Sequence, residues 1–106
     1  MKSNMKLKFT SQYQYTPIML MRKCGYMQIA SRKTGQVSYA RRFGVGHYPR
    51  FHIYIDPLDD GFQVNLHLDQ KAPSYGSHTA HNGEYDGEVV EREEERIRQI
   101  IESMRR

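Results

Sequence analysis

The chain alternates apolar and polar residues most regularly over residues 50–55 and 62–68. Successive side chains of a strand point to opposite faces of a sheet, so this pattern predicts two half-buried strands. Asp, Pro and Gly dominate residues 56–61, which are therefore expected to form the turn between them. One face of this pair would be apolar, and the other would carry His52, Tyr54, Gln63, Asn65, His67 and Asp69.

Weaker patterns add further strands before this pair. Alternation over residues 5–9 predicts a short edge strand, and residues 26–30 and 36–43 predict a hairpin. The four residues that precede Gln36 suit a type I turn closed by Gly35 in a left-handed conformation. The short apolar stretch at residues 18–21 does not distinguish a strand from a helical turn.

The last element is an expected helix over residues 88–106. Val89, Val90, Ile97, Ile100, Ile101 and Met104 recur at helical spacing and form one apolar stripe. Acidic residues crowd the first half and two arginines end the segment, which is the charge order that the helix dipole favours.

These elements predict a single α+β domain covering residues 1–106. Residues 1–69 would be rich in strands, residues 70–87 would form an irregular His-rich loop, and residues 88–106 would form the helix. We expect an antiparallel sheet of about four or five strands with the amphipathic helix on one face. At 106 residues the chain is too short for a two-domain enzyme.

Composition adds a constraint on stability and location. Leu, Ile, Val and Phe make up only about 20% of the chain, but eight Tyr and six Met supply further apolar surface. The lone Cys24 allows no internal disulfide, and no apolar run approaches the roughly 18 residues of a membrane span. We therefore expect a soluble cytoplasmic protein.

Charge is divided unevenly along the chain. Residues 1–55 contain ten Lys and Arg and no Asp or Glu, whereas the acidic residues all fall in the second half. Such a basic segment, interleaved with tyrosines, is typical of a surface that binds nucleic acid or another anion. It is equally consistent with arginines that are solvated or paired with the acidic helix. The candidate anion contacts are Arg32, Lys33, Arg41, Arg42 and Arg50.

Histidines and carboxylates cluster between residues 52 and 86. A divalent metal takes three or four nitrogen and oxygen ligands, and zinc is the ion that a histidine-rich set favours. Glu84 is the candidate general base, and Cys24 is a much weaker candidate nucleophile. The alternative is a hydrogen-bonded polar network that ties the loop to the sheet. The candidate metal ligands are His52, His67, Asp69, His78 and His81.

Part of this region resembles a small family of bacterial hypothetical proteins. The resemblance covers roughly residues 50–100 and implies no fold, activity or cofactor, only that this loop is the recognisable feature of the family. It rests on His67-Leu68-Asp69-Gln70-Lys71, Pro73-Ser74-Tyr75, His78, His81, Glu84-Tyr85-Asp86-Gly87 and residues 93–97.

Two functional hypotheses follow from the sequence. The first is a divalent-metal site that hydrolyses a phosphate-containing or other anionic substrate, with Arg41 and Arg42 contacting the anion. The second is a non-catalytic nucleic-acid-binding module in which the histidine network is structural. The sequence leaves open whether the protein is an enzyme. It is also compatible with a monomer or with a homodimer formed through an edge strand.

Overall fold

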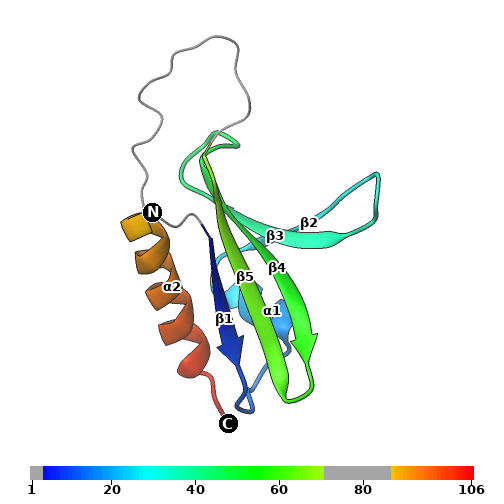
Figure 1. Cartoon of the computed structure of the whole chain (residues 1–106), viewed down its shortest axis with the longest axis vertical. Helices are drawn as coiled ribbons and strands as arrows, with labels where there is room; N and C mark the ends of the chain where they lie inside the picture. Colours follow the sequence, from blue (N-terminus) through cyan, green and yellow to red (C-terminus); the bar gives the residue numbers. More distant parts are fainter. Residues whose placement is uncertain (1–3, 71–86) are drawn as a thin grey trace.

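The computed structural model describes residues 4–70 and 87–106. Five strands form one antiparallel sheet in the order β1-β5-β4-β3-β2, and the C-terminal helix packs against it (Figure 1). The predicted α+β fold is therefore confirmed. The elements are β1 (Asn4–Phe9), α1 (Pro17–Lys23), β2 (Met27–Ala30), β3 (Val37–Arg42), β4 (Arg50–Leu58), β5 (Gly61–Asp69) and α2 (Gly87–Glu102).

The central pair β4 and β5 has the two faces that its alternation predicts. Ile53 lies opposite Leu66, and both side chains are completely buried. His52 lies opposite His67 in the same register, so these two side chains occupy the other face. The register therefore separates an apolar core face from a polar outer face.

The turn between β4 and β5 is shorter than the sequence indicates. β4 continues to Leu58, and only Asp59 and Asp60 separate it from β5, so the predicted six-residue turn over residues 56–61 is wrong. Pro57 lies within the strand and is paired with Phe62. The strand tolerates this proline because β3 pairs with β4 only as far as Ile53, which leaves the end of β4 at an edge.

The hairpin of β2 and β3 forms as expected around its glycine. Gly35 has a φ of 74°, and its N–H donates to the Ser31 carbonyl. The Ser31 N–H donates in turn to the Gln36 carbonyl and closes the loop. A left-handed conformation is costly for other residues, so Gly35 sets the register of this arm.

The undecided segment after Pro17 is a short helix, α1. Thr16 caps its N-terminus by accepting a hydrogen bond from the Met19 N–H at 3.3 Å, and Pro17 occupies the first turn. Gly25, with a φ of 92°, follows its C-terminal end. Leu20 and Met21 are completely buried and fix α1 on the core face.

Helix α2 begins at Gly87, one residue before the prediction, but ends at Glu102 rather than Arg106. Residues 103–106, which follow the helix, instead approach the segment after β1. Tyr13 and Arg105 form an antiparallel bridge, and the Arg106 N–H donates to the Gln12 carbonyl at 2.9 Å. This backbone pairing replaces the last helical turn.

Both helices contribute to one core on the same side of the sheet. Leu20 of α1 and Ile97 of α2 belong to the apolar cluster that includes Ile53 and Leu66. The opposite face carries the polar side chains of β4 and β5. Neither described helix is long and apolar enough to span a membrane.

Candidate functional site

The basic first half and the acidic helix meet at Glu93. Its side chain is only 4% exposed and lies in the stripe of α2 that faces the sheet. Arg96, one turn further on, donates from Nε to Oε1 and from Nη2 to Oε2, both at 2.9 Å. This forked contact orients the guanidinium and the carboxylate together.

Arg41 and Tyr26, which directly precedes β2, complete the surroundings of Glu93. Arg41 of β3 donates from Nη1 to Oε1 at 3.2 Å, and the Tyr26 hydroxyl donates to Oε2 at 2.6 Å. Burial, and next the Glu93 charge, raise the pKa of Tyr26 well above its usual value, so its hydroxyl stays a donor. Arg96 also donates to the Cys24 carbonyl at 2.6 Å. The cluster thus joins the sheet, the end of α1 and α2.

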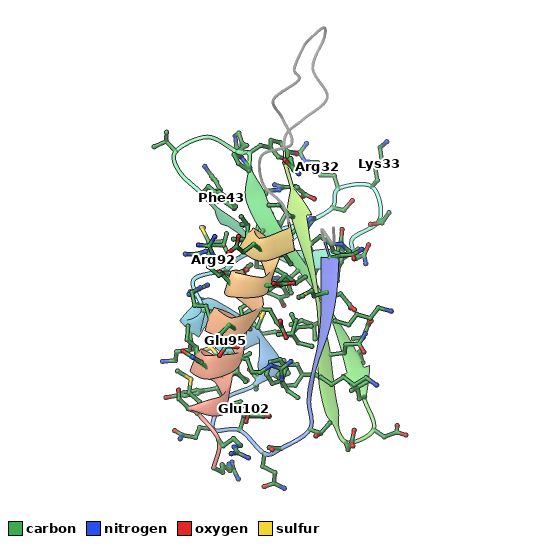
Figure 2. All side chains as sticks on the ribbon, turned by 60° about the vertical axis from the view of Figure 1, so that its left-hand side comes forward. Arg32, Lys33, Phe43, Arg92, Glu95 and Glu102 are labelled. Atoms are coloured by element: carbon green, nitrogen blue, oxygen red, sulfur yellow. The ribbon has the colours of Figure 1, made fainter. Side chains whose placement is uncertain are left out.

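A groove lies directly beside this buried cluster. It has a volume of about 400 Å³ and runs between the end of β3 and the first turns of α2. Figure 2 shows Phe43 and Arg92 on this side of the molecule, close to the start of α2. Four arginines and one carboxylate leave the groove with a surplus of three positive charges. Its lining is Arg41, Arg42, Phe43, Phe51, Val89, Arg92, Glu93 and Arg96.

Three of the five predicted anion contacts, Arg41, Arg42 and Arg50, lie near one another at the end of β3, and the other two do not. Arg41 and Arg42 line the groove, whereas Arg50 lies on β4 and pairs with Asp69. Arg32 and Lys33 are exposed in the turn between β2 and β3, away from Phe43 and Arg92 (Figure 2). Arg92 and Arg96 were not among the sequence candidates, because only the packing of α2 against the sheet brings them to the groove.

Three predicted metal ligands lie together on the outer face. His52 and His67 are opposite one another, and His52 Nδ1 is 3.1 Å from Asp69 Oδ2. Arg50 Nε donates to the same Asp69 oxygen at 3.2 Å. A hollow of about 310 Å³ lies over them, lined by His52, Tyr54, His67, Leu68 and Asp69.

Ser38 is a member of this network that sequence reasoning missed. Its Oγ is 2.8 Å from His52 Nε2. Because a carboxylate only accepts hydrogen bonds, His52 Nδ1–H donates to Asp69 and Nε2 accepts from the Ser38 hydroxyl. This is the order of contacts in a Ser–His–Asp triad. Ser38 is only 6% exposed, however, and does not line the hollow, so its hydroxyl orients His52 rather than facing a substrate.

Burial sets the protonation of His52. It lowers the pKa of this imidazole, the Asp69 charge opposes the shift, and the Arg50 charge adds to it. The neutral ring matches the assignment of one donating and one accepting nitrogen. His52 is therefore a neutral, oriented imidazole at physiological pH.

The metal site stays a prediction. Among residues 4–70 and 87–106, the structure contains no cluster of three His, Cys, Asp or Glu side chains placed to hold a metal ion. His78, His81 and the candidate base Glu84 lie outside the described residues. The described members, His52, His67 and Asp69, are three of the five proposed ligands.

Cys24 has the surroundings of an unreactive thiol. It is 1% exposed, and burial raises its pKa to about 11. The thiolate is the nucleophilic form of cysteine, so this residue is a core side chain at neutral pH.

The described structure thus defines an α+β protein with a basic groove on one side of its sheet and a histidine network on the other. No protein-family model, curated protein or solved structure matches the chain. Function is therefore inferred from these two sites.

Proposed function

We propose that the protein binds phosphate-bearing polyanions, nucleic acid above all, in the basic groove between β3 and α2. The observation that supports this proposal most strongly is the buried Glu93, which holds Arg41 and Arg96 in fixed positions at the groove. Arginine guanidinium groups form forked contacts with phosphate oxygens as they do with carboxylates. A pre-oriented pair loses less side-chain entropy when it binds.

The rest of the groove suits the same ligand. Arg42 and Arg92 are exposed and add positive charge that Glu93 does not pair with. Phe51 and Val89 supply an apolar wall. Phe43 packs against Phe51 with ring centroids 4.8 Å apart and ring planes tilted by 39°, yet remains 37% exposed. An exposed aromatic ring beside phosphate-binding arginines provides a surface on which a nucleotide base can stack.

The test compares two double variants that each remove two positive charges. Arg42→Gln with Arg92→Gln changes the groove, whereas Arg32→Gln with Lys33→Gln changes the hairpin turn. Fluorescence anisotropy with a labelled oligonucleotide should show an affinity loss of about tenfold or more for the groove variant, since each of its two substitutions removes a phosphate contact. The hairpin variant should lose much less. Equal losses in both variants would show that overall charge, rather than the groove, governs binding.

A second candidate function rests on the outer face. His67 and Asp69 line one hollow together with His52, whose two ring nitrogens are engaged by Asp69 and Ser38. We propose that this face contributes ligands to a zinc site which activates water for hydrolysis of an anionic substrate.

Elemental analysis of the purified untagged protein tests this second candidate. Stoichiometric zinc that disappears in His67→Ala, but persists in the control His47→Ala, is the expected result. His47 is exposed in the loop before β4 and does not line the histidine hollow. Protein that contains no metal, and whose melting temperature does not respond to added zinc, would contradict it.

A further inference from the structure

A second, larger hollow lies on the outer face beside β2 and β3. Its volume is about 580 Å³, within the range of small-molecule sites. Met27, Ile29 and Ala40 line it with apolar atoms, and Arg42, His47 and Arg50 add basic groups. Met27 is 71% exposed, so this apolar surface is open to solvent.

Aromatic and basic side chains lie together at the edge of this hollow. Arg50 Cζ is 4.8 Å from the centre of the Tyr48 ring, and Tyr48 is itself 38% exposed. An arginine stacked on a tyrosine presents one further planar face to a ligand. The hollow therefore combines an apolar surface with planar and cationic groups.

The hollow adjoins the basic groove. Arg41 and Arg42 are among the residues that line both. As neighbours in β3 they point to opposite faces of the sheet, Arg41 toward Glu93 and Arg42 toward Arg50. A band of positive charge thus passes around the end of β3 from the helix side to the outer face.

We infer that this outer hollow is a base-binding subsite and that the polyanion bound by the protein is single-stranded nucleic acid. This inference rests on the proposed function of the groove. The phosphates of a strand would follow Arg92, Arg41 and Arg42 around the sheet edge, and an unstacked base would pack on Met27 and Ile29. A duplex keeps its bases stacked and paired, so it cannot place one in the hollow.

The experiment measures the affinity of the intact protein for three probes at one salt concentration. These are a labelled single strand of about 12 nucleotides, the corresponding duplex, and inorganic polyphosphate, which has charge but no bases. The single strand should bind about tenfold more tightly than the duplex if an unstacked base contributes of the order of 1 to 2 kcal/mol.

Met27→Ser tests the hollow without changing charge. This variant should lower the affinity for the single strand about fivefold, because an apolar contact is lost, and should leave polyphosphate binding unchanged. Val37→Ser is the matched control: Val37 is also an exposed apolar residue of the hairpin, 40% exposed, but it does not line the hollow. It should bind all three probes as the unmodified protein does.

The outcomes separate the two proposals. Equal affinity for single strand and duplex, together with no effect of Met27→Ser, would overturn the base-binding subsite while leaving polyanion binding by the groove intact. Failure of all three probes to bind would overturn both. A loss of polyphosphate binding in Met27→Ser would assign the hollow a role in charge contacts and contradict its role as a base subsite.

Discussion

His52 is the side chain whose surroundings most directly couple the structure to pH. Its ring lies between Ser38 and Asp69, and burial lowers its pKa below the ordinary value of 6.5. The unfolded chain therefore takes up a proton more readily than the folded protein does. The stabilisation from the neutral ring is fully present above pH 6.5 and is lost as the pH falls toward the folded pKa.

This linkage predicts that the melting temperature falls between about pH 7.5 and pH 5, and falls less steeply in His52→Gln. Thermal unfolding followed by circular dichroism at a series of pH values measures both slopes. His47→Gln serves as the control, because His47 is exposed, and should retain the slope of the unmodified protein. The same slope in His52→Gln would show that other groups cause the pH dependence.

At Gly61 the structure leaves no room for a side chain. A Cβ at this position would collide with the Phe9 carbonyl oxygen of the neighbouring strand β1, and backbone cannot move aside as a flexible side chain does. We predict that Gly61→Ala lowers the free energy of unfolding by about 1 to 3 kcal/mol, measured by urea denaturation. Gly44→Ala, where a Cβ would meet nothing within 4 Å, should change it little.

Contacts between individual side chains, such as those around His52, were the least predictable feature of the structure. The alternation of β4 and β5 placed His52, His67 and Asp69 on one face correctly. Ser38 could not be found in the same way, because its contact with His52 depends on the register between β3 and β4. That register is fixed by packing rather than by any local motif.

At the scale of elements, α2 shows how a charged residue interrupts an apolar stripe. Val90, Ile97 and Ile101 are completely buried, and the position between them in the same stripe is Glu93. A carboxylate is tolerated there because Tyr26, Arg41 and Arg96 together donate to both of its oxygens. The gap in the stripe was visible in the sequence, but its partners were not.

We predict that Glu93→Gln destabilises the fold and leaves the arginines at the groove less firmly held. Loss of the charge leaves Arg41 and Arg96 without their anion, which should cost about 1.5 to 3 kcal/mol of unfolding free energy. The control Glu95→Gln changes an exposed residue of the same helix, as Figure 2 indicates, and should cost much less. Chemical denaturation measures both, and equal small losses would mean that the buried cluster does not stabilise the helix.

The apolar pattern over helix α1 does not distinguish a strand from a helical turn, although residues typical of a helix start and a helix end flank it. Thr16 and Pro17 are typical of a helix start, and Gly25 is typical of a helix end. The seven-residue helix between them is too short for apolar periodicity to reveal it. Its N-terminal cap and its C-terminal glycine were better guides than the pattern of buried residues.

At the scale of the whole molecule, the uneven charge distribution has two consequences. Part of the basic half pairs with the acidic helix, as Arg41 does with Glu93, so one of the two sequence interpretations holds for this residue. The remaining charge gathers where β3 ends, at Arg42 and Arg92 beside the groove. The uneven charge distribution therefore stabilises the helix on the sheet and also supplies a surface of positive charge.

The fold was largely predictable because alternation, turn residues and the amphipathic helix each act locally. The groove was not, because it forms only when the first turns of α2 pack beside the end of β3, about 50 residues apart in sequence, as in the contact of Arg41 with Glu93. Charge counting selected Arg41 and Arg42, which line the groove. It also selected Arg32 and Lys33, which the hairpin turn places elsewhere (Figure 2).

The salt dependence of oligonucleotide binding shows whether the groove binds a polyanion. If the groove's surplus of three positive charges neutralises three phosphates, the logarithm of affinity for a single strand should fall with the logarithm of salt concentration with a slope of about −2. Arg92→Gln should reduce the magnitude of that slope by about 0.7, whereas Lys33→Gln should not change it. An affinity independent of salt, or the same slope in Arg92→Gln as in the unmodified protein, would contradict polyanion binding in this groove.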